Sequence, residues 1–420
     1  MNKKNSTFVV KNTQAFKNKM LNWVKPFNIF CLLDNNNYNF ESPAFECLLA
    51  ADAIDFIQLT HATAFAELKQ FSTEHPGWLF GHFNYPSTQK EDVGFPDGFF
   101  FIPKYVIQLS KDTVSIEAQG TSPENIFEEI EAQSDEIGSV KKLTITIKNK
   151  TSEKEYYQKL TSIKQHLQRG DCYELNFCQE FFAENVSLDP LAVFYTLNKI
   201  SPNPFAAFYK IQDKYCACAS PERFIKKSGT TIISQPIKGT SKRYSADLIK
   251  DQESKAYLQT SQKEKSENVM IVDLVRNDLS KICTEGSVAV KELCGIYSFP
   301  QVHQMISTIT GTVHYDAHWT DIIEACYPMG SMTGAPKKRV MELIEQYEDT
   351  PRGLFSGTIG YVTPEGDFDF NVVIRSLFYN ETAKQLSFKA GGGITHLSDI
   401  EKEYQESLIK VAAIKSILEE

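Results

Sequence analysis

The sequence lacks the features that mark a membrane-spanning, secreted or nucleic-acid-binding protein. No apolar run reaches the ~18 residues that a membrane helix needs. The N-terminal stretch, MNKKNSTFVVKNTQ, contains lysines but no continuous apolar segment behind them, so we expect no secretory signal. Acidic residues outnumber basic ones by 53 to 44, and both signs are interspersed without a basic stripe. We therefore expect a cytoplasmic protein that binds neither a membrane nor nucleic acid.

The nine cysteines form no pattern typical of a disulfide framework or a metal site. Their number is odd, no CxxC occurs, and most lie in apolar stretches such as YCACAS. Cys216 and Cys218 would share one face of a strand, but a single CxC is a weak metal signal. We expect buried, reduced thiols. The eight histidines include no HExxH or other ligand pair at helical spacing, so zinc is not indicated.

The chain is long enough, at 420 residues, for a large core and two or three structural units. Before residue 150 the signals are loose: a short helix in AFKNKMLNWVKPF, a hairpin in FIPKYVIQLSKDTVSIEA and a strand at 143–148. Ser152 and Glu155 then form a capping box, and Gly170 suits the C-cap of the same helix. We place a boundary near residues 149–152, which gives domains at 1–150 and 151–416.

After Gly170 the chain alternates helices with long strands that look antiparallel. Asp189 followed by Pro190 marks one helix start. The long strands and the small number of short crossovers favour the α+β class over a doubly wound sheet. The predicted strands are CYELNFCQEFF, PFAAFYKI, YCACASPERFIK, TTIISQPI, GTIGYV, FDFNVVIRSLFY and QLSFKAGGG.

Two Glu-x-x-Glu pairs lie in predicted helices far apart in the chain. They are Glu264 with Glu267, and Glu403 with Glu406, the second pair following a capping box that begins at Ser398. Each pair shares one helical face. Most such pairs are solvated helix faces, but two pairs brought together would form a hard-oxygen site suited to Mg²⁺.

Three further residues could be functional or merely structural. Lys238, in SQPIKGTSKR, follows a β-branched run and a proline, so its amine is either solvated in a loop or directed into a pocket. Arg375, in NVVIRSLFY, needs a carboxylate from the protein or from a ligand. Glu222, in SPERF, either pairs with Arg223 or has a raised pKa and donates a proton. The glycine-rich segments GSMTGAP, SGTIGY and AGGG suit tight turns or close approach to a ligand.

Over residues 150–415 these motifs together resemble the chorismate-binding enzymes. The segments SPERF, QPIKGT, ENVMIVDLVRNDL, GSMTGAPKKRVMELIE, SGTIGYV and AGGGIT…EYQESLIKV stand in the order typical of that family. The resemblance implies an α+β fold with two β-sheets sandwiched between helices. The family includes the anthranilate, aminodeoxychorismate, isochorismate and salicylate synthases, and the N-terminal third resembles them only loosely.

The resemblance also implies roles for individual residues. Lys238, where anthranilate synthases carry alanine, is typical of aminodeoxychorismate synthases and would attack ring carbon C2 of chorismate, while Glu222 would protonate the departing C4 hydroxyl. Ammonia would then enter at C4. The metal site implied for Mg²⁺ consists of Glu267 and Glu406 as direct ligands, with Glu264 and Glu403 acting through water. The implied substrate contacts are Thr333, Tyr361, Arg375, Gly391, Gly392 and Gly393.

Two positions depart from the family pattern. Gln304, in VHQMIST, stands where the family carries histidine, and its amide can position a substrate but cannot transfer a proton. Glu174, in GDCYELNF, stands where isochorismate and salicylate synthases carry a general-base lysine and where related aminating enzymes usually carry glutamine. The sequence assigns no role to Glu174.

The expected activity is conversion of chorismate and ammonia to 4-amino-4-deoxychorismate, a precursor of 4-aminobenzoate and folate. No glutaminase signature occurs, so the nitrogen would come from a separate glutamine amidotransferase subunit or from free ammonia. Two alternatives stay open: an anthranilate or isochorismate-type synthase, and a protein that binds chorismate without turning it over.

Overall fold

The computed structural model describes residues 3–38, 45–60, 64–88, 93–140, 145–300 and 302–419. The helices are α1 (Thr13–Val24), α2 (Phe65–Glu74), α3 (Pro123–Glu131), α4 (Glu153–Arg169), α5 (Pro190–Ile200), α6 (Leu248–Thr260), α7 (Gln262–Ser280), α8 (Trp319–Cys326), α9 (Lys337–Tyr347), α10 (Ile400–Glu419) and the short 3₁₀ helix η1 (Gly330–Met332). The strands are β1 (Lys4–Val9), β2 (Ile29–Asp34), β3 (Cys47–Leu59), β4 (Leu79–Phe83), β5 (Gly98–Ser110), β6 (Thr113–Ala118), β7 (Lys148–Asn149), β8 (Glu174–Ala183), β9 (Phe205–Ile211), β10 (Lys214–Ser220), β11 (Arg223–Ser228), β12 (Thr231–Gln235), β13 (Ile237–Lys242), β14 (Ala289–Ser298), β15 (Val302–Thr312), β16 (Gly334–Ala335), β17 (Thr358–Val362), β18 (Phe368–Asn371), β19 (Ser376–Asn380) and β20 (Gln385–Ile394).

The strands pair antiparallel throughout the described ranges and form two sheets that are joined through the long strands β3 and β5. The first sheet runs β1–β6–β5–β3–β2–β9–β10–β19–β20–β8, with β7 and β16 beyond β8. The second sheet continues from the other end of β5 through β4, β17, β18, β11, β12 and β15, and β13 and β14 flank β15. A bulge between Ala53 and Asp55 of β3 lies where the two sheets meet.

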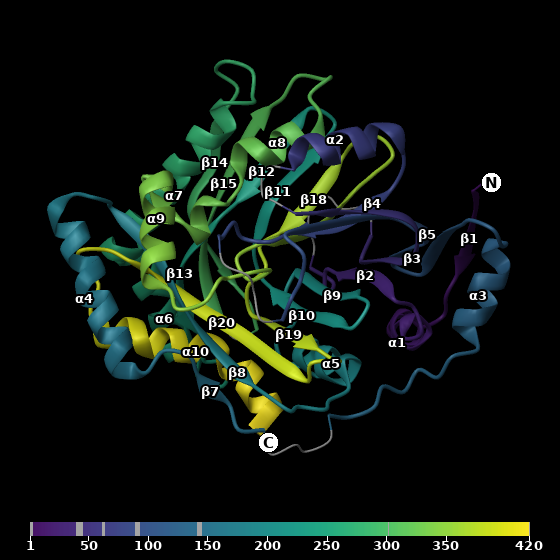
Figure 1. The fold of residues 1–420 in the computed structure, drawn as a ribbon, viewed down its shortest axis with the longest axis horizontal. Helices are drawn as coiled ribbons and strands as arrows, with labels where there is room; N and C mark the ends of the chain where they lie inside the picture. Colours follow the sequence, from purple (N-terminus) through teal and green to yellow (C-terminus); the bar gives the residue numbers. More distant parts are fainter. Residues whose placement is uncertain are drawn as a thin grey trace.

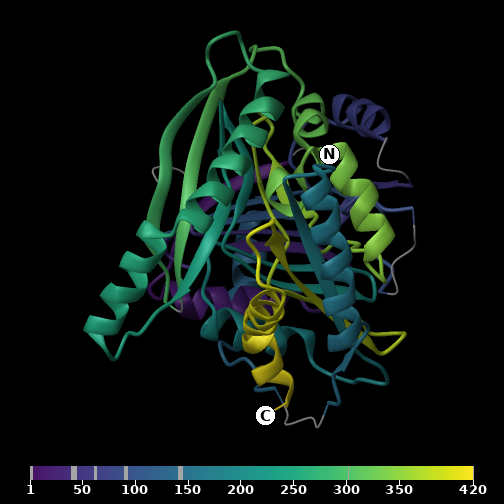
Figure 2. The same ribbon diagram turned by 90° about the vertical axis from the view of Figure 1, so that its left-hand side faces the viewer.

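Helices cover the outer faces of both sheets (Figure 1). A hydrophobic core fills the space between the sheets. The inner core contains residues of both sheets, among them Phe80, Phe101, Tyr209 and Phe378. Helices α1, α3, α5 and α10 pack on the first sheet, α4 and α9 pack on β8, and α2, α7 and α8 pack on the second sheet. Figure 2 shows the same layers from the side. This arrangement confirms the α+β prediction of two sheets between helices.

Local sequence signals correctly predicted several helix ends. Ser152 and Glu155 form the capping box of α4, Gly170 ends this helix with a φ of 80°, and Asp189 caps α5. The last helix differs from the prediction, because the Lys402 amide donates to the Asp399 carboxylate and Ser398 instead bonds to the amide of Thr395.

Two predicted strands also differ. The segment FDFNVVIRSLFY is not one strand, since residues 372–375 leave the sheet between β18 and β19 and Arg375 adopts a φ of 52°. The predicted strand at 143–148 begins outside the described residues, and only Lys148 of its described part lies in a strand.

Strands from both sides of residue 150 pair with one another. β2 pairs with β9, and β4 pairs with β17. The boundary near 149–152 stays a prediction.

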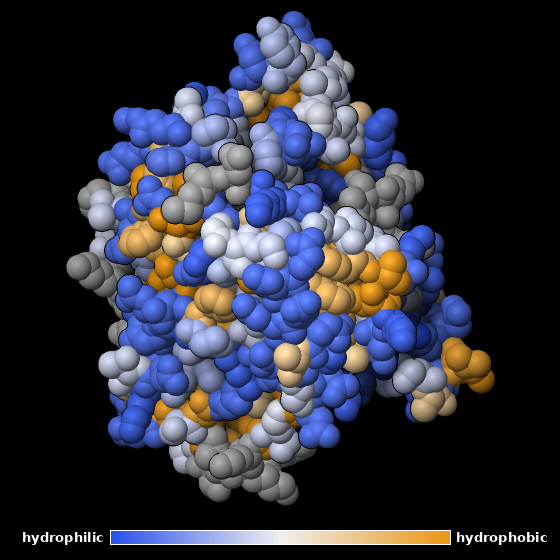
Figure 3. Space-filling model, turned by 90° about the vertical axis from the view of Figure 1, so that its right-hand side faces the viewer, coloured by the Kyte–Doolittle hydropathy of each residue, from blue (hydrophilic) through white to orange (hydrophobic). Residues whose placement is uncertain are grey.

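Within the described ranges, no helix combines the length and the apolar composition needed to cross a membrane. The face shown in Figure 3 is mainly hydrophilic, with hydrophobic residues in small separate groups.

Candidate active site

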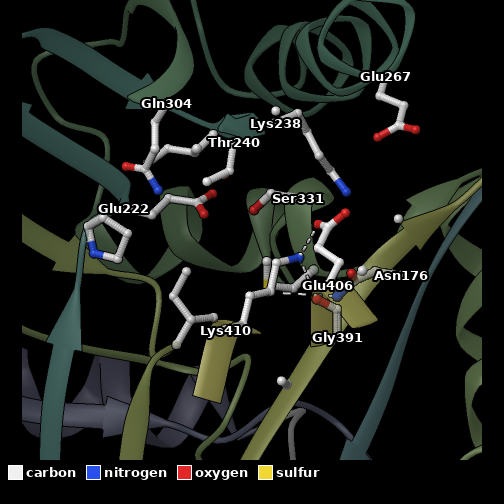
Figure 4. Close-up of a pocket in the computed structure, with 18 of the residues that line it drawn as sticks. Asn176, Glu222, Lys238, Thr240, Glu267, Gln304, Ser331, Gly391, Glu406 and Lys410 are labelled. Atoms are coloured by element: carbon white, nitrogen blue, oxygen red, sulfur yellow. Dashed lines mark hydrogen bonds and ion pairs between the residues drawn. The ribbon is translucent and has the colours of Figure 1, made fainter. Parts of the chain in front are cut away.

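A cavity of about 110 Å³ lies where β8, β13, β15 and β20 meet helices α7 and α10. Its lining is strongly charged. Figure 4 shows side chains from distant segments, including those of Lys238, Glu222, Gln304 and Glu406, around one shared space. The lining residues include Asn176, Glu222, Lys238, Thr240, Lys263, Glu264, Glu267, Gln304, Ser331, Met332, Phe355, Ile374, Arg375, Lys389, Gly391, Gly392, Gly393, Glu403, Glu406 and Lys410.

The backbone of β13 directs Lys238 into this cavity. The pairing of β13 with β15 is irregular between Ile237 and Thr240, and Gly239 in the bulge has a φ of 97°. Lys238 is 9% exposed, and its Nζ lies 2.6 Å from Oε1 of Glu174. The residue is therefore a buried amine in a strand and not a solvated loop lysine.

Glu222 lies between β10 and β11 and is 2% exposed. Burial raises the pKa of its carboxyl to about 7, although a hydrogen bond from Ser331 and the charge of Lys238 act in the opposite direction. Its sequence neighbour Arg223 instead pairs with Asp369, with Nε 3.0 Å from Oδ1. Glu222 thus has the properties of a proton donor at neutral pH and not those of an ordinary ion-pair partner.

Arg375 lines the same cavity at the break between β18 and β19. Burial lowers the pKa of its guanidinium, and no carboxylate of the described residues contributes to that pKa. A partly buried arginine that pairs with no carboxylate of the described residues is suited to bind the carboxylate of a ligand. Of the two explanations that the sequence left open, the structure favours the ligand.

The two glutamate pairs meet at the cavity, one on α7 and one on α10. Burial raises the pKa of Glu267 to about 8 and also raises that of Glu264, whereas the charge of Lys410 lowers the pKa of Glu406. Lys410 lies 2.8 Å from Glu406. Carboxylates from positions about 140 residues apart are therefore gathered at one side of the cavity.

These four glutamates supply carboxylate oxygens, the donors that a hard cation prefers, and lysines lie beside three of them, Glu267, Glu403 and Glu406. Glu267 Oε1 is buried without a hydrogen-bond partner among the described residues. Lys263 lies between the pairs, with Nζ at 2.9 Å from Glu403 and 3.7 Å from Glu267. Among the residues described, no three acidic, thiol or imidazole groups lie close enough together to hold a metal as they stand. Carboxylate oxygens are the donors that Mg²⁺ prefers, but the Lys263 ammonium lies between Glu267 and Glu403.

Gln304 and the glycines of β20 also lie at the cavity. Gln304 is 2% exposed, and its Oε1 has no hydrogen-bond partner among the described residues. A Cβ atom on Gly393 would lie 2.6 Å from Glu174 Oε1 and 2.8 Å from Lys238 Nζ. Glycine at this position therefore leaves the space that the ion pair occupies. A Cβ on Gly391 would lie 2.4 Å from the sulfur of Cys178, and one on Gly392 would lie 3.3 Å from Glu403.

Two predicted substrate contacts do not reach the cavity. Tyr361 faces the core between the sheets, where its ring packs near Trp78 and Phe80, with centroids 5.9 and 6.0 Å away. Thr333 is fully buried, and its hydroxyl donates to the carbonyl oxygens of Met329 and Gly330 in its own turn.

The cavity also contains residues that the sequence did not single out. Phe355 and Ser331 line it. Lys263 and Lys410 belong to it as well. The spacing of Lys410 four residues after Glu406, and the position of Lys263 directly before Glu264, were the available sequence signals.

Two solved structures share the fold of this chain. The structure of anthranilate synthase component I from Streptococcus pneumoniae superposes with a TM-score of 0.78 at 23% identity, over 91% of this chain and 94% of that one. The menaquinone-specific isochorismate synthase MenF from Escherichia coli superposes with a TM-score of 0.81 at 16% identity, over 99% and 94% of the two chains.

The chain belongs to the chorismate binding enzyme family, whose profile matches residues 29–416. Aminodeoxychorismate synthase component 1 of Escherichia coli K12 is 39% identical over 277 residues, which are 66% of this chain and 60% of the relative. The alignment thus spans less than two thirds of that relative's length.

Proposed function

We propose that this protein is a cytoplasmic aminodeoxychorismate synthase component that converts chorismate and ammonia to 4-amino-4-deoxychorismate. The observation that carries the proposal is the buried Lys238 amine in the same cavity as Glu222. The relative from Escherichia coli, which is named as this enzyme, supports the assignment. The product is a precursor of 4-aminobenzoate and hence of folate.

The residues of the cavity divide the reaction between them. The neutral Lys238 amine attacks ring carbon C2 of chorismate and forms a covalent adduct while the C4–oxygen bond breaks. Glu222, whose pKa of about 7 leaves it partly protonated at neutral pH, gives the departing hydroxyl a proton so that it leaves as water. Ammonia then bonds to C4 as the Lys238 nitrogen leaves C2. Arg375 binds a substrate carboxylate, and Gln304 orients the ring.

Mg²⁺ is part of this proposal. Glu264, Glu267, Glu403 and Glu406 would hold it, because these carboxylates line the cavity and a buried oxygen of Glu267 has no hydrogen-bond partner in the described part of the chain. When bound, the ion would neutralise the carboxylates of the protein and of the substrate. Lys263 would leave the space between Glu267 and Glu403.

The nitrogen source is proposed to be a separate glutamine amidotransferase subunit, in a permanent or transient heterodimer, or free ammonia. The name of the Escherichia coli relative, component 1, supports a partner component. Ammonium added in excess should replace that subunit in an assay.

The test is a product assay on the purified chain with chorismate, Mg²⁺ and ammonium, followed by addition of aminodeoxychorismate lyase. We expect 4-aminobenzoate after the lyase is added. Anthranilate in place of 4-aminobenzoate would contradict the proposal and favour an anthranilate synthase. Calorimetric chorismate binding without any product would favour a protein that binds without turnover.

A further inference from the structure

The ion pair between Lys238 and Glu174 is a buried contact for which the proposed reaction has given no role. The Lys238 Nζ to Glu174 Oε1 distance is 2.6 Å, and the two side chains are 10% and 1% exposed. Glu174 opens β8, and β20 carries Gly393 beside it. Any side chain at Gly393 would collide with both charged groups, so the local backbone leaves room for this pair.

Glu174 depends on Lys238 for the compensation of its charge. Apart from this ion pair, neither oxygen of its carboxylate has a hydrogen-bond partner among the described residues. A buried carboxylate with only one cationic contact is costly, because it gives up its hydration for a single interaction. A purely structural glutamate in this environment would gain from further hydrogen-bond donors, and this one has none within the described part of the chain.

The same pair creates a problem for catalysis. Burial lowers the pKa of Lys238, but Glu174, Glu267 and Glu222 together raise it above its ordinary value. The resting amine is therefore an ammonium, which cannot act as a nucleophile. It must lose a proton before it can attack, and of the described carboxylates only that of Glu174 lies within ion-pair distance of Nζ.

We propose that Glu174 is the base that takes the proton from Lys238 and so produces the nucleophilic amine. The inference rests on the proposed function. Transfer of one proton from Nζ to Oε1 turns two opposite charges into a neutral amine and a neutral acid. A cavity without water favours such a neutral pair more than bulk water does. The charges of Glu267 and Glu406 also act on Lys238, and a bound cation would neutralise these two carboxylates.

Protons and electrons balance over the full cycle. The free Nζ electron pair forms the bond to C2, both ring double bonds shift, and the C4–oxygen bond breaks as Glu222 supplies a proton to give water. Ammonia adds at C4, and the secondary ammonium leaves C2 as the neutral Lys238 amine. The new C4 ammonium returns a proton to Glu222, and the Glu174 acid returns its proton to Lys238.

The test measures the rate at which chorismate forms the covalent adduct with Lys238 in the absence of ammonia. Mass spectrometry monitors this rate for the wild-type protein and for Glu174→Gln across a range of pH. We expect adduct formation by Glu174→Gln to fall about 100-fold at pH 7. The rate of Glu174→Gln relative to wild type at the same pH should rise as the pH increases and solvent deprotonates Lys238, and Glu174→Asp should restore part of the rate. Chorismate affinity by calorimetry should stay within about threefold of wild type.

A matched control is Glu180→Gln, which neutralises another buried carboxylate of β8, bonded to Ser387. It should form the adduct at the wild-type rate. Several results would overturn the inference: an equal or faster rate for Glu174→Gln at pH 7, an equal loss in Glu180→Gln, or loss of chorismate binding in Glu174→Gln. Absence of any adduct in the wild-type protein would instead overturn the proposed function itself.

Discussion

At the scale of single residues, burial of charge determines what each group in the cavity can do. Glu222 and Glu267 lose hydration and keep protons up to about pH 7 and about pH 8. Arg375 stays without an internal carboxylate partner among the described residues. These groups are poorly compensated inside the protein, which is the arrangement expected where a charged substrate completes the site.

Glu222 provides a prediction about pH. A proton donor must be protonated, so wild-type kcat should decline as the pH rises through about 7. Glu222→Gln should lower kcat by about 10² to 10⁴-fold and remove this decline, because an amide cannot transfer a proton to the departing oxygen as a carboxylic acid does. Rates measured from pH 5.5 to 9 with saturating chorismate and ammonium test this. A wild-type profile that stays flat through pH 7 would contradict the assigned role.

Arg375 provides a prediction about substrate binding. Arg375→Ala should raise KM for chorismate about 10- to 100-fold, since a hydrogen bond to a charged group contributes about 1.5–3 kcal/mol. The variant should unfold at nearly the same temperature as the wild type, because Arg375 forms no ion pair with any of the described residues. The control is Arg276→Ala, an exposed residue of α7 paired with Asp273, which should leave KM unchanged. An unchanged KM in Arg375→Ala would exclude the carboxylate contact.

At the scale of secondary-structure elements, irregular backbone places the reactive side chains. The bulge in β13 directs Lys238 into the cavity. The glycines of β20 have no side chains and so leave room for the side chains of neighbouring elements. Neither feature adds a polar group of its own. Both instead set where the polar groups of neighbouring elements can lie.

Gly393→Ala tests this role of the strand. The added Cβ would force Lys238 and Glu174 apart, and misplacement of a reacting group by about 1 Å can cost about 100-fold in kcat. The flexible ends of both side chains can move, so the melting temperature should change little. Gly138→Ala, where the added Cβ meets nothing within 4 Å, should behave as wild type. Full activity in Gly393→Ala would contradict the packing argument.

Local elements were predictable from sequence where short-range chemistry determines them. The capping box of α4, the αL glycine at its end and the Asp189 cap of α5 depend on residues within a few positions of each other. The break at residues 372–375 was not predictable, because the apolar pattern continues through it and the backbone amide of Val372 instead bonds to the carbonyl of Glu222.

The candidate site was predictable as a set of residues but not as a geometry. The glutamates, Lys238, Glu222, Gln304, Arg375 and the glycines of β20 do line one cavity. Tyr361 and Thr333 do not line it. The side chain of Tyr361 lies on the face of β17 that packs in the core between the sheets, and that of Thr333 bonds within the turn around η1. The contact between Glu174 and Lys238 joins two strands distant in sequence, and no local pattern indicates it.

At the scale of the whole molecule, the fold brings carboxylates from α7 and α10 to one place. Without a cation, this arrangement lowers the stability of the folded state. Burial raises the pKa of Glu267 from 4.5 to about 8, so between these pH values the folded protein keeps a proton that the unfolded chain releases. Stability should therefore fall as the pH rises from about 5 to about 8, where the folded state binds more protons than the unfolded state.

Thermal unfolding tests this statement. Glu267→Gln should reduce the loss of stability between pH 5.5 and 8 and raise the melting temperature at pH 8 by about 2 °C. Mg²⁺ should stabilise the wild type more at pH 8 than at pH 5.5, and should stabilise Glu267→Gln less. Glu253→Gln, an exposed change on α6, is the control. Equal Mg²⁺ effects on wild type and Glu267→Gln would exclude Glu267 as a ligand.

The central claim is that Lys238 becomes covalently bonded to the substrate. The most direct measurement is the intact mass of the protein incubated with chorismate and Mg²⁺ in the absence of ammonia, with peptide mapping of any adduct. We predict a mass increase equal to chorismate less one water, located on Lys238, absent from Lys238→Ala and reversed by ammonium. An unmodified Lys238 in a preparation that still turns over chorismate would contradict the account.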